Sequence, residues 1–386
     1  MSFFFQIVYF SIYNIWLTLK SPLFWVVLGI LFFQYRKIGE MEKKILGKQK
    51  MHLVYNIFIS TILGLIGGAI GSIIFIYFEI TINPKDFYYI LPLAILLSLI
   101  NPKFICFSYA GGVVSLISLI MGFDVNVTGI MFVIGVLHLI ESFLILIDGS
   151  RNRIPVFMEK RREIIGGFTM NRFWPVPFSI LMDSGYIYPV TIIAILGYGD
   201  YALTNYPKKK SKETAGFLFV FSIILIIFAK LSMDNNLFKY IASIFAPLAH
   251  ELIIIFGRKR EEKGEYIFAP SSHGLKILDT LTNGIGHRLG LKPGDIILSL
   301  NGRRIYSNRD IEEILYFNPN FIWMNIFDTK KGLILKEYRD YENGIKDLGV
   351  VVVSSIPEHV FVVRELEPPI SRLIQRFKKN KSRFKN

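Results

Sequence analysis

The stretch Ala249 to Phe256, AHELIIIF, places a histidine directly before a glutamate inside an apolar segment. In zinc metalloproteases the signature H-E-x-x-H sets two imidazoles one helical turn apart, so that both bind zinc while the glutamate activates a water molecule. Position 254 is Ile254, so the second imidazole is missing here. Any metal site around His250 and Glu251 would have to take further ligands from elsewhere in the chain.

A second group of ionisable residues lies in and just after the apolar run 127–147. His138 and Glu141 are three residues apart, so they face one side of an expected helix, and Asp148 follows it. Ionisable groups inside a membrane are by default functional, but buried polar side chains also join helices, through hydrogen bonds of about 1 kcal/mol or less. Three interpretations stay open: structural pairing, a non-catalytic partner or lipid site, and a metal site with His138, His250 and Glu251 as candidate ligands.

The single cysteine, Cys106, lies in the apolar run FICFSYAGGVVSLISLI. One cysteine rules out a disulfide or a Cys-based zinc framework within the chain, so we expect an inert buried thiol. The sequence also contains no P-loop, Rossmann glycine pattern or G-x-S-x-G elbow. These observations predict that the protein is not an enzyme and carries no cofactor.

The composition indicates a membrane protein. Of 386 residues, 52% are hydrophobic, and the mean hydropathy is +0.44, so much of the apolar surface must face lipid. Lys and Arg number 44 against 30 acidic residues, an excess that is normally held at the anionic cytoplasmic leaflet, and we do not expect nucleic acid as a partner. The amino-terminal segment has neither a charged leader nor a cleavage pattern, so we expect it to stay in the mature protein.

A spanning helix needs ~20 apolar residues. Six runs are apolar enough to cross a bilayer, of which 87–100 is short: 53–80, 87–100, 104–123, 127–147, 215–231 and 237–256. Two further regions, 3–35 and 173–203, are interrupted by KSP and by MDSG and YP. We expect each of them to be a kinked span, a re-entrant pair or an interfacial helix.

Basic residues predict the orientation, because Lys and Arg in short loops are retained on the cytoplasmic side. Clusters within 36–52, 148–172 and 208–212, and after the last run from 257 onward, go inside. The connections TINPKD, DVN and SMDNN contain only Lys85 and go outside. Six crossings satisfy every loop, provided that 173–203 makes no net crossing.

After about Glu265 the composition changes to charges, turn residues and short β-type runs, which predicts a separate soluble domain. In GLKPGDIILSLNGRRIYSNRDIEEIL, DIILSL reads as a strand and Asn301-Gly302 as a hairpin turn. Ser307 and Asp310 then fit a capping box for a helix that carries Ile311, Ile314 and Leu315 on one face.

This succession resembles a PDZ domain of the bacterial type. In that family a peptide adds as an extra strand beside the strand that follows a glycine-containing loop. The matching loop is SHGLKI, and the resemblance implies a peptide site made by Gly274, Leu275, Lys276, Ile277, Ile311, Ile314 and Leu315. An alternative is that the chain closes its own groove, with VFVVRELEPP as the covering segment. A secreted serine protease with such a domain would carry its globular catalytic part where this chain has membrane segments.

The order of parts, with GGFTMNRFWPVPFSIL in the middle and AHELI on the last helix, resembles the MinJ family of Gram-positive division proteins. The resemblance implies a non-enzymatic scaffold at the cell membrane, at septum and poles, that links DivIVA-like and MinD-like division proteins. The alternative is a site-2-type intramembrane metalloprotease or an inactive relative of one. We therefore predict an α-helical polytopic membrane domain over 1–260, with about six spans plus the two ambiguous segments, followed by a small cytoplasmic α+β PDZ domain over 265–366.

The remaining segment, 367–386, is basic and contains no acid after Pro368. Ile370, Leu373, Ile374 and Phe377 share one helical face, which predicts an amphipathic helix on anionic membrane lipids. The residues expected to contact the membrane surface are Arg372, Arg376, Lys378 and Lys379. A disordered solubilising end is the alternative.

Overall fold

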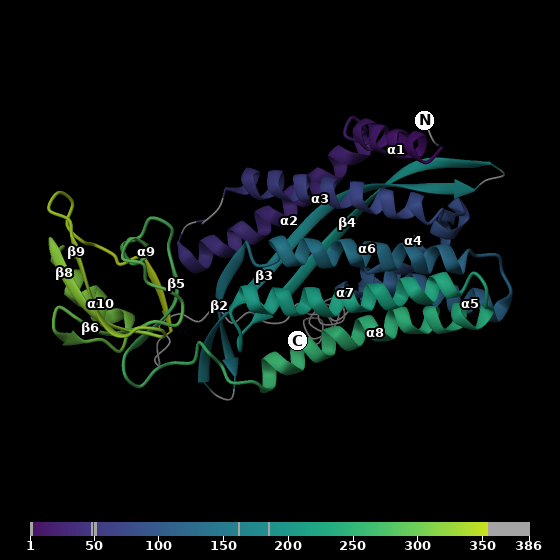
Figure 1. Ribbon diagram of the computed structural model, residues 1–386. Helices are drawn as coiled ribbons and strands as arrows, with labels where there is room; N and C mark the ends of the chain where they lie inside the picture. Colours follow the sequence, from purple (N-terminus) through teal and green to yellow (C-terminus); the bar gives the residue numbers. More distant parts are fainter. Residues whose placement is uncertain (1–2, 48, 50–51, 161–162, 184–185, 354–386) are drawn as a thin grey trace, which may run out of the picture.

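The computed structural model describes residues 3–47, 49, 52–160, 163–183 and 186–353 (Figure 1). Within this part of the chain, four helices are long and apolar enough to cross a membrane: α3 (Leu53–Tyr77), α6 (Val127–Asp148), α7 (Pro207–Leu231) and α8 (Asn236–Lys263). A fifth span results if α1 (Phe3–Thr18) and α2 (Pro22–Leu46), bent by 66° at the break over residues 19–21, count as one. The protein is a multi-pass membrane protein.

The expectation of six spans is corrected at the runs 87–100 and 104–123. They form α4 (Pro84–Ile100) and α5 (Phe107–Met121), of 17 and 15 residues, joined by the 3-10 turn η1 (Pro102–Ile105). Both are shorter than the ~20 residues of a spanning helix. The turn between them contacts the middle of α6 and of α8, so α4 and α5 form a re-entrant hairpin. The hairpin returns to the side where it starts, so the predicted sides of the other loops do not depend on it.

The region 173–203, for which a kinked span, a re-entrant pair or an interfacial helix was expected, is part of a β-hairpin. β3 (Glu163–Asp183) pairs antiparallel with β4 (Ile187–Ala202), from Phe168↔Ala202 to Asp183↔Ile187. β2 (Arg153–Lys160) continues the sheet on β3, and β1 (Thr81–Ile82) pairs parallel with the end of β3. Proline at 175, 177 and 189 opposes a helix here. The membrane domain is therefore not purely α-helical.

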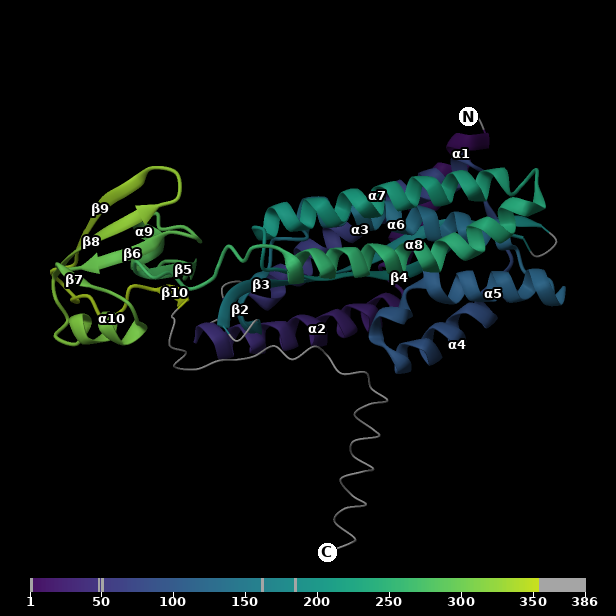
Figure 2. The ribbon, with the colours of Figure 1, turned by 90° about the horizontal axis from the view of Figure 1, so that it is seen from below.

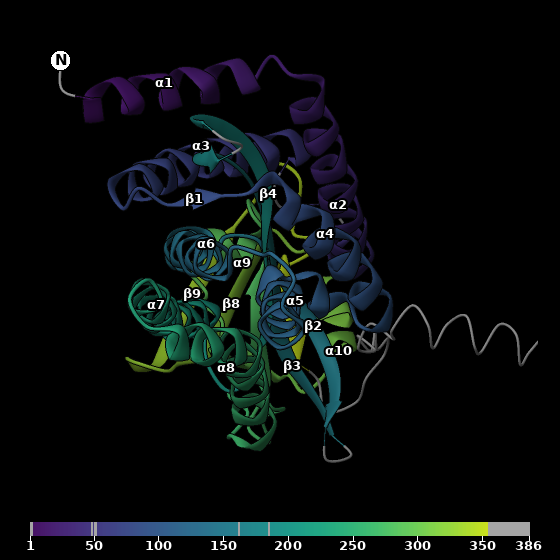
Figure 3. The same cartoon turned by 90° about the vertical axis from the view of Figure 1, so that its right-hand side faces the viewer.

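Glycines on α3 explain how closely this helix packs on the hairpin. Gly64 and Gly68 lie one turn apart, and a methyl group on either would collide with the carbonyl oxygen of Pro175 or Pro177 on β3. This face of α3 therefore carries no side chain at Gly64 and Gly68, where the backbone of β3 packs against it. In the view along the long axis, the hairpin runs between α3, α6 and α7 on one side and α2 and α4 on the other (Figure 3).

The carboxy-terminal part is an antiparallel sheet region compatible with a PDZ-like α+β domain. Its strand order is β10-β5-β6-β8-β9, with β7 paired to β6. The strands are β5 (Leu275–Thr280), β6 (Ile296–Leu300), β7 (Arg303–Arg304), β8 (Phe321–Asp328), β9 (Gly332–Arg339) and β10 (Val350–Val353), and the helices are α9 (Ile285–Arg288) and α10 (Asn308–Leu315). The predicted strand, the Asn301-Gly302 turn and the Ser307–Asp310 capping box are confirmed.

The PDZ-like domain lies beyond the ends of α2 and α8, beside β2 and β3 (Figure 2). Phe268, which follows α8, packs with Phe168 of β3 and with Leu278 and Val353 of the domain. The backbone N–H of Gly166 also donates to the carbonyl of Phe268 at 2.9 Å. The domain is thus seated on the base of the hairpin.

Candidate functional site

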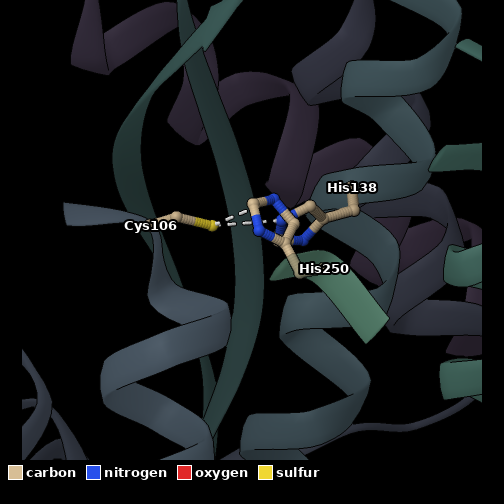
Figure 4. A group of neighbouring side chains, drawn as sticks. All are labelled: Cys106, His138 and His250. Atoms are coloured by element: carbon tan, nitrogen blue, oxygen red, sulfur yellow. Dashed lines mark hydrogen bonds between the residues drawn. The ribbon is translucent and has the colours of Figure 1, made fainter. Parts of the chain in front are cut away.

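Three ligand-type side chains from three segments meet inside the membrane domain. Cys106 precedes α5, His138 lies in α6 and His250 in α8, and their side chains converge (Figure 4). The Sγ atom of Cys106 lies 3.2 Å from Nε2 of His138 and 3.8 Å from Nε2 of His250. All three ligand atoms lie within 4.8 Å of one another.

Each imidazole is also hydrogen-bonded through Nδ1, the ring nitrogen that faces away from the sulfur. Nδ1 of His138 donates to the carbonyl of Ile134 at 2.7 Å, and Nδ1 of His250 lies 3.2 Å from the hydroxyl of Tyr109. That hydroxyl donates to Oε2 of Glu251 at 2.6 Å, so it accepts from His250. Both Nε2 atoms are therefore left facing the sulfur.

The three predicted metal candidates separate into two roles. His138 and His250 come together, whereas the Glu251 carboxylate pairs with Nζ of Lys103 at 2.5 Å and with Tyr109. The sequence reasoning missed Cys106, which it expected to be an inert thiol. The available signal was the break between the two short apolar runs, which contains Lys103 and lies just before Cys106.

The other intramembrane acids differ in their surroundings. The Oε2 atom of Glu141 lies 4.0 Å from Nε2 of His138, at the margin of the three-residue cluster. Asp148 belongs to a separate network, where it accepts from Nε of Arg172 at 2.6 Å and from Nε1 of Trp174 at 2.9 Å. Arg172, counted among the charges of a cytoplasmic loop, is fully buried in this network.

The peptide groove expected along β5 is corrected by the sheet topology. β5 is hydrogen-bonded to β6 on one side and to β10 on the other, so a partner strand has no free edge there. Four of the proposed lining residues belong to the domain core, each at most 4% exposed: Leu275, Ile277, Ile311 and Leu315. Ile314 packs partly against the same core.

The remaining two proposed peptide-binding residues also make contacts within the protein. A side chain at Gly274 would collide with the carbonyl of Ile297, so this glycine serves strand packing. Nζ of Lys276 donates to the carbonyl of Ile267 at 3.2 Å, and burial lowers the pKa of this amine. Lys276 thus fastens β5 to the segment that joins the two domains.

Among the described residues, the edge strand on this side of the sheet is β10. It follows Leu348-Gly349, where Gly349 has a φ of +63° that favours glycine. The N–H of Leu281 donates to the carbonyl of Gly349 at 2.8 Å. Because hydrogen bonding alternates along an antiparallel strand, the N–H and C=O of Val350 point away from β5. This second glycine-led apolar run, DLGVVVV, thus forms the edge that was expected at β5.

Two of the predicted sites lie outside the described residues. They are the membrane-surface residues Arg372, Arg376, Lys378 and Lys379, and the covering segment VFVVRELEPP. Both stay predictions.

Comparison with known proteins gives a partial likeness. No protein-family model matches the chain. Proteins from two strains of Staphylococcus epidermidis, each described as "Serine protease HtrA-like", are 32% identical to it over 72 residues. The match covers 19% of this chain and 11% of each relative, so the chain spans about a tenth of the length of the curated relatives it matches. The likeness supports a PDZ-like region and reaches no further.

Proposed function

We propose that the protein is a non-enzymatic membrane scaffold that captures a cytoplasmic partner by strand addition to β10. The observation that carries the proposal is the chemistry of this edge. An unpaired strand edge is a template for another chain, and proteins normally protect it with charges, proline or a covering element. β10 consists of four valines, and no described strand pairs with its outer side.

The opposite edge of the same sheet makes a useful contrast. β9 carries Lys336, Glu337 and Arg339, the charged side chains that oppose strand addition. The two edges therefore differ in the property that governs pairing. In a PDZ-like domain the main chain of the added strand supplies affinity, and alternate side chains supply specificity.

The proposed setting is the division site, and it rests on the resemblance to the MinJ family. The partners are then DivIVA-like and MinD-like proteins, and the domain faces the cytoplasm. The basic segment at 367–386 adds contact with anionic lipids. A tagged copy imaged in dividing cells is expected at septum and poles; uniform membrane fluorescence would argue against a division role.

A photo-crosslinking residue tests the binding edge in the same cells. At Val350, whose side chain is partly buried against the domain core at this edge, it is expected to capture the DivIVA-like or MinD-like protein. At Leu335 on β9, which is 55% exposed, it is expected to capture neither. Capture from Leu335 alone would place the partner on the wrong edge. If the segment 360–369 covers β10, its deletion will increase capture at Val350.

The second candidate function, a site-2-type metalloprotease or an inactive relative, draws on the Cys106–His138–His250 cluster. Hydrolysis also needs a carboxylate free to activate water. Glu251 is engaged by Lys103 and Tyr109, which favours the scaffold. Cleavage of a membrane-inserted substrate by the purified chain, lost in Glu251→Gln, would reverse this preference.

A further inference from the structure

We propose that Cys106, His138 and His250 bind a zinc ion inside the membrane domain. The site joins the re-entrant hairpin to α6 and α8, and it is independent of partner binding at β10.

The two separations from the Cys106 sulfur fit a tetrahedral ion. With Zn–S near 2.3 Å and Zn–N near 2.0–2.1 Å, a tetrahedral angle places sulfur and nitrogen about 3.5 Å apart. The observed separations from the Cys106 sulfur, 3.2 Å to His138 and 3.8 Å to His250, lie on either side of this value. The two Nε2 atoms lie within 4.8 Å of each other, against about 3.3 Å in a tetrahedral site, so the imidazoles have to move together when an ion binds.

The hydrogen bonds of the two Nδ1 atoms are of the kind that metal-binding histidines make. A ligating histidine donates its other ring N–H to a carbonyl or a carboxylate-linked group, which fixes the tautomer. His138 donates to the Ile134 carbonyl, and His250 donates to a tyrosine bound to Glu251. A second layer of this kind exists for both rings.

Neutral imidazoles in these tautomers leave an imbalance that a cation resolves. Two Nε2 lone pairs face one sulfur, and a thiol has a single proton to donate. One buried acceptor would then lack its donor, which is unfavourable by about 1–3 kcal/mol. A metal ion accepts both nitrogen lone pairs and the thiolate at once.

The ligand types and the surrounding charges indicate which metal ion the site would bind. A thiolate with two imidazoles favours zinc or a copper ion over magnesium or calcium, which prefer oxygen. Glu141 lies 4.0 Å from Nε2 of His138 and is the nearest candidate for a fourth ligand. Zinc, one thiolate and one carboxylate sum to zero charge, as a low-dielectric site requires. The nearby Lys103–Glu251 pair is neutral by itself.

Such an ion has a structural task here. The segment 101–106, with the short 3-10 turn η1 at its centre, interrupts the α-helical backbone and contacts the middle of α6 and α8. Such irregular backbone is tolerated at membrane depth only when protein holds it. A zinc ion on Cys106 ties the end of this turn to both helices.

Metal analysis of the full-length chain, purified in detergent from zinc-supplied cells, tests the site. We expect about one zinc ion per chain. Cys106→Ser, His138→Gln and His250→Gln should each lose at least about tenfold in zinc affinity. His287→Gln removes an exposed histidine of α9 and should keep the full content.

Cobalt substitution gives a readout that does not depend on the folding of variants. Because Cys106 is the only cysteine of the chain, a thiolate-to-cobalt charge-transfer band can come from Cys106 alone. We expect this band in the unaltered protein. Purified protein without zinc and without the cobalt band would overturn the proposal and leave a thiolate–imidazolium group. Full zinc content in Cys106→Ser would overturn it as well.

Discussion

Arg172 of β3 donates through Nε to Oδ2 of Asp148 at the end of α6, at 2.6 Å, and both side chains are fully buried. Nη1 and Nη2 of the same guanidinium donate to Asn56 and Ser60 of α3, so one arginine joins the hairpin to two helices. This network holds the sheet in the helical domain.

Loss of this arginine should destabilise the protein strongly. Arg172→Met leaves Asp148 buried without its main partner, and removing one member of a buried pair is unfavourable by about 3–5 kcal/mol. Arg151→Met is the matched control, because Arg151 also contacts Asp148, at 2.7 Å, but is 34% exposed. Thermal unfolding in detergent should show a large loss for the first variant and a small one for the second. Equal losses of stability in the two variants would contradict the claim that the buried Arg172 contributes more than the partly exposed Arg151.

The close contact of α3 with β3 predicts opposite effects of alanine at two helical glycines. At Gly68 a methyl group meets the carbonyl of Pro177, so the helix must move from the strand. At Gly216 of α7 no atom lies within 4 Å of the added carbon. Gly216→Ala should be neutral or stabilise by up to about 1 kcal/mol, through helix propensity. Gly68→Ala should lower the unfolding temperature; an unchanged value would refute the packing.

The capping box of α10 predicts a pH dependence. Hydrogen bonds from the N–H groups of Tyr306 and then Ser307 hold the pKa of Asp310 below its usual range. The folded-state pKa is depressed, so the stabilisation is present above the unfolded value of about 3.9 and is lost as pH falls through the folded value.

Thermal unfolding of the 265–386 fragment measures this effect. Asp310→Asn should reduce the stability difference between pH 7 and pH 3 relative to the unaltered fragment. Ser307→Ala should reduce stability at neutral pH by about 1 kcal/mol. Identical pH profiles with and without Asp310 would show that the capping box does not carry the effect.

Local signals explain which parts of the fold could be predicted. The Asn301-Gly302 turn, the strand before it and the Ser307 cap depend on residues close in sequence, and the sequence identified all three. The long spans followed from hydropathy. The β3–β4 hairpin could not be predicted, because its apolar run is compatible with a membrane helix and with a buried strand. Only the pairing of the two strands distinguishes them.

The sites depend on contacts between distant residues. Cys106 meets His138 across 32 positions and His250 across 144, and no spacing rule connects them. The predicted groove failed for a similar reason. The loop before β5 has the expected glycine, but the register of β10 covers the edge of β5. A single apolar strand near the end of the chain thus changes which backbone groups are free.

A proline scan of β10 in the full-length chain tests partner capture most directly. Val350→Pro removes an N–H that points away from β5, a position where an edge strand tolerates proline. Val351→Pro instead removes an N–H on the β5 side and should lower the unfolding temperature. Leu335→Lys on β9 is the control at the opposite edge.

The measurement is the affinity of each variant for the DivIVA-like and MinD-like proteins, beside its thermal unfolding. Val350 packs partly against the domain core, so Val350→Pro is expected to lower the unfolding temperature, but less than Val351→Pro, which also loses a hydrogen bond to β5. Val350→Pro is expected to lose at least about tenfold in partner affinity, which is 1.4 kcal/mol. Leu335→Lys should bind unchanged. Full affinity in a folded Val350→Pro variant would contradict strand addition at β10.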